Sequence, residues 1–192
     1  MSTTQPIRNP QQLKIFKSYY LEVKPNPRNY AMIITGLNSA LRISDLLNLT
    51  CCDVYDYKSQ KFLAHICIQE KKTGKQSRIY INQKIRNALS SYIDFTQNAG
   101  SEYLFKSQRQ KEKPLSRIQA YRIIKEAAAY AGLDEDISCH SLRKTFGYYA
   151  WKLGTPPAML MNIYNHSAFQ ITRRYLGIDQ DDRDEVFMNI DI

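Results

Sequence analysis

The most informative stretch of the sequence reads HSLRKTF at residues 140–146. The apolar spacing that follows predicts a helix over 141–153, which Gly154 ends. A histidine at such a place is often a neighbour of the helix N-cap, where Ser141 or His140 itself can bond the first free backbone N–H groups. Taken alone, the stretch therefore indicates the start of a helix and no chemistry.

Three further stretches flank it along the chain. Residues 40–47 read ALRISDLL and place Arg42 just ahead of a short predicted helix over 44–49. Residues 72–74 read KTG in a polar turn, and residues 165–167 read NHS, with His166 nine residues ahead of Tyr175. Each has an ordinary explanation, because arginines before helices are mostly surface residues, turn lysines protect strand edges, and most of the 14 tyrosines must be packing residues.

The combination points to phosphodiester chemistry. Breaking a phosphodiester without a metal requires a nucleophile, cations that hold the non-bridging oxygens, and an acid that protonates the leaving oxygen. Arginine suits the phosphate because its planar fork of donors matches two oxygens, which the point charge of lysine cannot do. The chain supplies Arg42 and Arg143 in predicted ordered elements and Tyr175 near its C-terminus.

These motifs, in this order and at these spacings, resemble the catalytic motifs of the tyrosine recombinases, the phage integrase family. The resemblance runs from about residue 10 to the end of the chain. It implies the α+β, mainly helical, fold of a tyrosine recombinase catalytic domain, with a small antiparallel β-sheet or hairpin. The implied activity is site-specific cleavage and rejoining of DNA strands, without metal, cofactor or ATP.

The resemblance also implies roles for the phosphate-binding residues and the nucleophile. Arg42 and Arg143 would clamp the scissile phosphate and stabilise its pentavalent transition state. Asp45, where the family often has Glu, would orient Arg42. Tyr175 would attack and leave a 3′-phosphotyrosyl link. Because a free tyrosine has a pKa of about 10, its attack at neutral pH requires a nearby base or a positive field.

The resemblance assigns proton transfer to a lysine and the two histidines. Lys72 would be the general acid that protonates the departing 5′ hydroxyl, although Lys71 and Lys75 lie close enough to take its place. His140 would assist proton transfer with the nucleophile, as suits an imidazole that titrates near neutrality, and His166 would hydrogen-bond the phosphate. A lysine at a hairpin tip would be able to swing in only when DNA is bound.

The sequence departs from the family at several places. Only about 40 residues precede Arg42, so we expect no N-terminal core-binding domain and a single catalytic domain over 1–192. Such a chain is either a compact member, similar to the recombinases of fimbrial phase switching, or a fragment. Residues 164–166 read YNH where Leu-Gly-His is usual, and Lys144 stands where a second histidine is frequent. Asn165 in place of Gly would alter the turn that presents His166.

Charge divides the chain into two parts. The 192 residues carry a formal net charge of +9. Residues 176–192 hold six acidic side chains and one arginine, a net charge of −5, which leaves +14 on the catalytic body, residues 1–175. A body that basic indicates a polyanionic partner, and we expect DNA affinity that falls steeply with salt. A dense basic run either contacts the DNA backbone or is a solvated loop and helix face, and the sequence favours neither: Lys106, Arg109, Lys111, Lys113, Arg117, Arg122 and Lys125.

Composition excludes other classes of protein. The chain is 43% hydrophobic and 23% charged, as a folded globular protein is, and no apolar run approaches the roughly 18 residues of a membrane span. The N-terminus lacks the pattern of a secretion signal, so we expect a cytoplasmic protein that acts at the nucleoid. Four cysteines and three histidines offer no zinc-binding spacing, and we expect no metal.

The periodicity of apolar residues predicts helices around one small antiparallel sheet. A period of two predicts strands over 61–69 and 77–81, joined by the lysine-bearing turn as a hairpin. Besides 44–49 and 141–153, helices are expected over 11–22, 30–41, 82–95, 116–131, 156–164 and 168–175.

Three functions are weighed from the sequence. The first is a recombinase that acts on double-stranded recombination sites and assembles on DNA through its acidic C-terminal tail, residues 176–192, with room for accessory DNA-bending proteins. The second is a non-catalytic DNA-binding regulator on the same fold, which would need no nucleophile. The third is an enzyme that relaxes DNA as type IB topoisomerases do. The retained nucleophile, lysine, histidines and arginines argue against the second, since binding alone needs no nucleophile. The third shares this chemistry, and the short chain and the context of the motifs favour the first over it.

Overall fold

A computed structural model describes residues 4–69, 74, 76–95, 102–110, 112–133, 136–178, 184 and 187–190 of the chain. The helices are α1 (Pro10–Ser18), α2 (Pro27–Ser39), α3 (Ile43–Leu47), α4 (Gln83–Ser90), α5 (Arg117–Tyr130), α6 (Cys139–Lys152), α7 (Pro157–Tyr164) and α8 (Phe169–Leu176). Two shorter turns are the π-helical η1 (Tyr19–Val23) and the 3₁₀-helical η2 (Cys51–Asp53). The strands are β1 (Tyr55–Asp56), β2 (Lys61–Phe62), β3 (His65–Gln69) and β4 (Gln76–Tyr80). The α+β, mainly helical, class is as predicted.

The β-structure is two small sheets, so the prediction of one sheet was wrong. The expected long strand over 61–69 breaks at residues 63–64. Its first part pairs antiparallel with β1, which was not predicted, and its second part pairs antiparallel with β4. The β3–β4 register, with His65 opposite Tyr80 and Gln69 opposite Gln76, confirms the hairpin. The turn residues 70–73 and 75, including Lys71, Lys72 and Lys75, lie outside the described residues.

Helix ends follow local chemistry that the sequence carries. Asn9 and Asn26 cap α1 and α2 with their side-chain oxygens, each ahead of a proline at the first helical position. The predicted helix over 82–95 ends already at Ser90. The predicted helix over 30–41 ends at Ser39 because Ala40 adopts a left-handed conformation, with φ of 53°.

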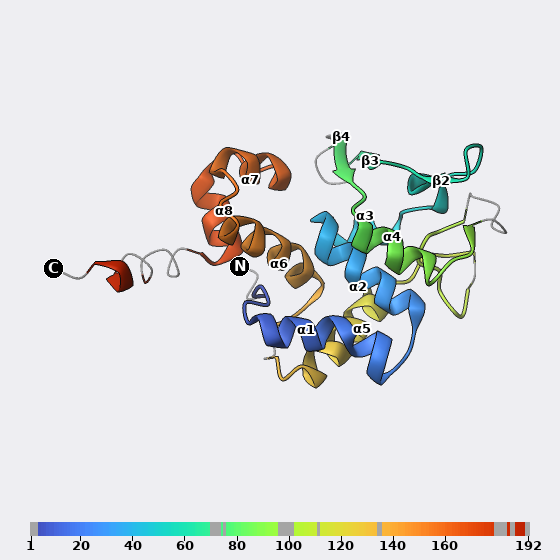
Figure 1. The fold of residues 1–192 in the computed structure, drawn as a ribbon, viewed down its shortest axis with the longest axis horizontal. Helices are drawn as coiled ribbons and strands as arrows, with labels where there is room; N and C mark the ends of the chain where they lie inside the picture. The colour runs from blue at the N-terminus through green and yellow to red at the C-terminus, as the bar shows by residue number, and fades with distance from the viewer. Residues whose placement is uncertain are drawn as a thin grey trace.

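The core lies mainly between α1, α2, α4 and α5, with a smaller second cluster around α7 and α8 (Figure 1). In the first region α1 and α5 lie side by side, while α6, α7 and α8 gather on the opposite side of the molecule from the strands. The second cluster consists of Ala40, Leu160, Tyr164, Leu176 and Ile178. Within the described part of the chain, no helix is both long and apolar enough to span a membrane.

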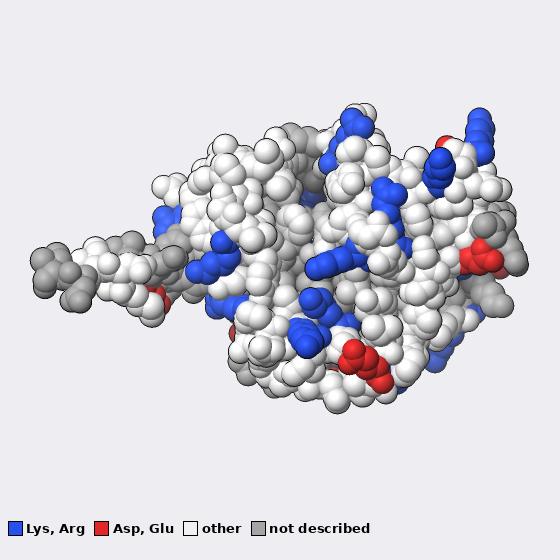
Figure 2. Space-filling view, in the orientation of Figure 1, with Lys and Arg blue, Asp and Glu red and all other residues white. Residues whose placement is uncertain are grey.

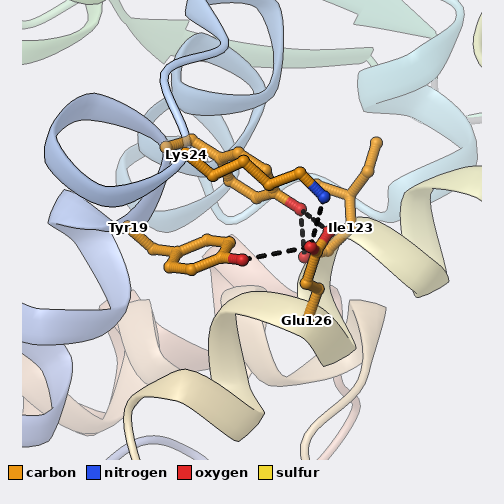
Figure 3. Close-up of polar contacts among 5 residues, drawn as sticks. Tyr19, Lys24, Ile123 and Glu126 are labelled. Carbon is orange, nitrogen blue, oxygen red and sulfur yellow. Dashed lines mark hydrogen bonds and ion pairs between the residues drawn. The ribbon is translucent and has the colours of Figure 1, made fainter.

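A carboxylate on α5 fastens the chain after α1 (Figure 3). Glu126 accepts hydrogen bonds from the Tyr19 hydroxyl at 3.0 Å and the Tyr20 hydroxyl at 2.8 Å, and it pairs with Lys24 at 2.5 Å. The bond from Lys24, followed by that from Tyr20, lowers the pKa of Glu126. The single carboxylate therefore joins η1 to α5, and the π-helical turn places two consecutive tyrosines on it.

Gly147 allows α6 to approach α7 and α8 closely. A Cβ atom at this position would lie 2.4 Å from the Tyr164 hydroxyl oxygen and 2.5 Å from Leu176 Cδ2. Both neighbours are fully buried, so neither can move into solvent. The absence of a side chain at Gly147 thus sets the spacing of α6, which carries Arg143, from α7 and α8, which flank the turn of His166 and carry Tyr175.

We expect Gly147→Ala to destabilise the protein by about 1–3 kcal/mol, as overpacking of a filled core does. Helix propensity alone would make the alanine variant more stable by about 0.5–1 kcal/mol. The expected change in unfolding free energy is therefore opposite to the effect of helix propensity. Urea unfolding followed by far-UV circular dichroism measures the difference. Unchanged or increased stability would contradict the packing described here.

Candidate active site

Arg42 lies at the corner between α2 and α3. It is the N-cap residue of α3, half-buried, and its backbone carbonyl accepts the N–H of Asp45 at 2.9 Å. Asp45 is 6% exposed in the first turn of that helix, where a carboxylate interacts favourably with the helix dipole. The pair therefore lies within one helical turn, as the proposed orienting role of Asp45 requires.

Arg143 is the central group of the site. It lies on α6 with 5% of its surface exposed, and its guanidinium donates to the carbonyls of Ala40 and Tyr164. The same guanidinium lies 4.6 Å from the centre of the Tyr164 ring, a cation–π contact, and the Tyr164 hydroxyl donates to the Arg143 carbonyl at 2.7 Å. The left-handed turn at Ala40 thus connects the Arg42 corner directly to Arg143.

His140 lies in the first turn of α6, on the exposed surface. Ser138 caps this helix: its hydroxyl accepts the His140 N–H at 3.4 Å, while the Ser138 N–H donates to the Ser141 hydroxyl at 3.0 Å. Partial desolvation of the ring lowers the pKa of His140, and the charges of four cations lower it further: Arg117, Lys144, Arg143 and Arg42. The last two place His140 in the electrostatic field of both proposed phosphate-binding arginines.

His166 is presented by the turn after α7. Asn165 adopts the left-handed conformation, with φ of 61°, that glycine often supplies, and asparagine tolerates it well. The His166 N–H then bonds the Met161 carbonyl at 3.0 Å, and the ring Nδ1 lies 3.0 Å from the hydroxyl of Thr172 on α8. Asn165 therefore adopts a backbone conformation that glycine would also adopt, and whether it alters the turn relative to glycine stays a prediction.

Tyr175 packs against His166, which the sequence places with it, and against Tyr164, which it does not. Its ring centre lies 5.4 Å from that of His166 and 5.4 Å from that of Tyr164. Burial raises the pKa of Tyr175, whereas the charge of Arg143, a side-chain hydrogen bond with Arg143, and the charge of Arg42 oppose the rise. The phenol is therefore protonated at neutral pH, and the arginines stabilise the anion that it would form on deprotonation.

A cleft of about 360 Å³ opens beside these residues. Its walls come from the α2–α3 corner, β4, α6 and the end of α7, and Arg42, Arg78 and Arg143 all line it. Figure 2 shows lysine and arginine side chains around the hollow on this face, with few acidic side chains. Because β4 forms one wall, the hairpin that carries Lys72 begins at the cleft, while Lys72 itself lies outside the described residues.

The described structure thus brings together Arg42, His140, Arg143, His166 and Tyr175, from segments up to 133 residues apart. Sequence reasoning missed Tyr164, which contacts Arg143 through its ring, its hydroxyl and its backbone carbonyl. It also missed Arg78, which lines the cleft. Only the departure at residues 164–166 could have indicated Tyr164. The described residues hold no group of three or more His, Cys, Asp or Glu side chains placed to share a metal ion.

Both histidines of the candidate site are expected to titrate below the ordinary value of 6.5, since desolvation and nearby cations lower the pKa of His140 and of His166. Below about pH 6.5 the unfolded chain then binds more protons than the folded one. The stability that this difference provides is complete above about pH 6.5 and is lost as the pH falls through the folded-state values. Histidine-detected NMR titration of the DNA-free protein measures both; midpoints at or above 6.5 would contradict the described surroundings.

Comparison with solved structures defines the fold. The fold matches the crystal structure of XerA recombinase with a TM-score of 0.75 at 20% identity, over 98% of this chain and 64% of that one. It matches XerH site-specific recombinase bound to a palindromic difH substrate with a TM-score of 0.72 at 18% identity, over 98% of this chain and 54% of that one. The fold is that of a tyrosine recombinase catalytic domain.

Sequence comparison identifies the family. The family model described as the phage integrase family matches residues 11–181, so the chain belongs to that family and to its tyrosine recombinases. The probable integrase/recombinase YoeC of Bacillus subtilis (strain 168) is 45% identical over 182 residues, which cover 94% of this chain and 93% of that protein. Tyrosine recombinase XerD of Corynebacterium glutamicum is 27% identical over 164 residues, and the chain spans about half of its length. Type 1 fimbriae regulatory protein FimB of Escherichia coli (strain K12) is 27% identical over 77% of this chain and 72% of that protein.

Proposed function

We propose that this chain cuts and rejoins DNA strands at specific sites through a 3′-phosphotyrosyl intermediate at Tyr175. The observation that carries the proposal is the contact of the Tyr175 ring with His166, together with the nearby buried Arg143, whose charge lowers the pKa of Tyr175, and a cleft lined by arginines that includes Arg143. A nucleophile, two phosphate-binding cations and two imidazoles then share one site.

The proposed reaction conserves the energy of the phosphodiester bond. The Tyr175 hydroxyl oxygen attacks the phosphorus and loses its proton, with assistance from His140, while Arg42, Arg143 and His166 bind the non-bridging oxygens. The bond to the 5′ oxygen breaks, and Lys72 gives that oxygen a proton. A 5′ hydroxyl from a partner strand reverses these steps, so that no ATP is needed. The side chains named above supply the charge and the protons, and the proposed steps involve no metal. The cytoplasmic location and action at the nucleoid stay predictions.

The test is capture of the covalent intermediate. Nicked duplexes that tile the DNA flanking the gene for this chain, each labelled on the cleaved strand, are incubated with the protein and resolved on a denaturing gel. A nick near the cleavage point releases the short product and traps the link. We expect an SDS-resistant adduct whose phosphopeptide maps to Tyr175. Specific binding without an adduct would instead favour a regulator, and relaxation of any supercoiled plasmid without site preference would favour topoisomerase-like activity.

We also propose that the chain divides into a basic catalytic body, residues 1–175, and the acidic C-terminal tail, which contacts a neighbouring protomer on DNA. The side chains of Phe187 and Met188 are 79% and 82% exposed in the described part of the tail, and that of Ile190 is 56% exposed. Apolar side chains so exposed are available for protein contact.

Deletion of residues 180–192 is expected to weaken assembly on a DNA carrying two adjacent half-sites several-fold more than binding to one half-site. The reason is that the deleted segment is acidic and would contribute little to phosphate contact. Native gel shift with both DNAs measures the two affinities. An equal loss on both DNAs would count against the tail as a protomer contact.

A further inference from the structure

Lys144 is a buried cation that the proposed reaction does not use. It follows Arg143 on α6, is 5% exposed, and its Nζ atom lies 5.1 Å from the centre of the Tyr175 ring. A lysine is rarely buried without a specific partner, because removing its charge from water is costly. Its position against the proposed nucleophile therefore calls for a function.

The partner that fixes Lys144 is the N-terminal strap, residues 4–8. The ammonium donates a hydrogen bond to the Thr4 carbonyl. Further along the strap, the Ile7 N–H donates to the hydroxyl of Thr145 at 2.9 Å, and the Ile7 side chain is fully buried. The strap thus takes one of the three N–H bonds of Lys144 and also bonds the next residue on α6.

The strap also reaches the helix that carries Tyr175. Arg8 donates to the carbonyl of Gly177, the residue that ends α8, at 2.7 Å. The Tyr149 hydroxyl on α6 donates to the Arg8 carbonyl at 2.9 Å. The strap therefore joins α6 to the end of α8, so that the distance between Lys144 and the Tyr175 ring is set by contacts on both helices.

A cation at this distance acts on both forms of the phenol. It is attracted to the face of the neutral ring, which orients it, and more strongly to the phenolate, whose charge spreads into the ring. Opposite charges within about 4–6 Å shift a pKa by about 1–3 units. Arg143 and Arg42 act on Tyr175 in the same direction, His166 and Tyr164 contact its ring, and Arg8 lies near Lys144. Lys144 is the cation among these whose only described aromatic contact is the nucleophile itself.

We propose that Lys144, held by the N-terminal strap, is a positioning residue for Tyr175 that orients its ring and stabilises the attacking phenolate. The inference rests on the proposed function of Tyr175 as nucleophile. It adds a cation on the ring face to the arginines that act at the phosphate. Burial and the charge of Arg8 lower the pKa of Lys144. The hydrogen bond to the Thr4 carbonyl of the strap favours the charged form and so opposes this effect.

The first experiment measures the phenol directly, without DNA. A fluorinated tyrosine is placed at 175 in the full chain, which lowers the titration into a range where the protein is folded and provides a single ¹⁹F NMR signal. Lys144→Met removes the charge and keeps much of the volume, while Lys144→Arg keeps the charge. We expect the pKa of the residue at 175 to rise by about one unit in the first variant. It should change by less than a third of that in the second. Equal titration in wild type and Lys144→Met would overturn the proposal.

The second experiment measures the reaction. The single-turnover rate of adduct formation should fall about tenfold at neutral pH in Lys144→Met, with the pH–rate profile displaced to higher pH, and Lys144→Arg should recover most of the rate. A lysine that only anchors the strap would lower stability without displacing the profile. If wild type forms no adduct while the ¹⁹F titration still responds to Lys144, the proposed function fails and the coupling of the two residues stands.

If the Lys144 variants do not fold, the coupling is measured on Lys144 itself, with Tyr175 changed instead. Phenylalanine cannot ionise, whereas a fluorinated tyrosine at 175, chosen to ionise before Lys144, forms the phenolate first. The pKa of Lys144, followed by NMR of ¹⁵N-labelled lysine, should therefore be lower in Tyr175→Phe than in the chain with the fluorinated residue. Reciprocal coupling of the two groups requires this result. An unchanged Lys144 titration would overturn the proposal.

Discussion

Tyr175→Phe is expected to abolish the covalent adduct, with a loss of at least about 10⁴-fold in cleavage, the scale typical of removing a nucleophile. The ring remains, so its contacts with His166 and Tyr164 are kept and folding is expected to be little changed. Binding to DNA should likewise persist, because the basic surface is unaltered. Adduct yield, gel-shift affinity and thermal unfolding, measured on the same preparation, separate these effects.

The matched control for this change is Tyr19→Phe. It also removes one hydroxyl, whose hydrogen bond to Glu126 is 3.0 Å long, and it lies on η1 and does not line the cleft. We expect the control to form the adduct at close to the wild-type rate. An adduct that persists in Tyr175→Phe and maps to Tyr164, the buried phenol beside it, would reject Tyr175 as the nucleophile.

Arg143→Lys is expected to reduce cleavage by about 10²–10³-fold, as loss of one donor to a developing anion does. An ammonium is a point charge and cannot reach the Ala40 carbonyl, the Tyr164 ring and a phosphate together as the planar guanidinium does. Because the group is buried, we also expect a loss of about 2–3 kcal/mol in unfolding free energy, the scale of hydrogen bonds to charged groups. Single-turnover cleavage and urea unfolding measure the two losses.

Arg86→Lys serves as the matched control for structure. Arg86 also donates to two backbone carbonyls, those of Ile81 and Leu63, and also lies over an aromatic ring, that of Phe62, but away from the cleft. The control should lose stability while cleavage at a temperature well below unfolding stays near wild type. If the two variants lose cleavage equally, the role of Arg143 at the phosphate is contradicted.

Much of the fold could be predicted because its signals are local. The Asn-Pro pairs at 9–10 and 26–27 mark helix starts, and the alternation over 65–69 marks a strand of the hairpin. The break of the predicted strand at residues 63–64 could not be read, since the pairing partner β1 is only two residues long and carries no periodic signal. Likewise, nothing local marks Ser90 as the end of α4.

The residues of the candidate site could be predicted where they belong to sequence motifs. The five described motif residues come together, while the contacts that fix them depend on packing between distant segments. Tyr164 against Arg143, and the Thr4 carbonyl against Lys144, join positions 21 and 140 residues apart. No pattern in the sequence encodes such pairs, because they depend on how α6, α7 and the strap pack. Lys72 stays a prediction.

The strap has a consequence for synthesis of the protein. Ile7 bonds Thr145, and Arg8 bonds Gly177, across 138 and 169 residues of chain. During synthesis, residues 4–8 must therefore wait for residues 145 and 177 to be made before these contacts can form. Contacts of such long range form late in folding. The surroundings of Tyr175 are consequently complete only once synthesis has passed residue 177 and residues 4–8 have docked, so a chain that stops before that point presents no finished site to DNA.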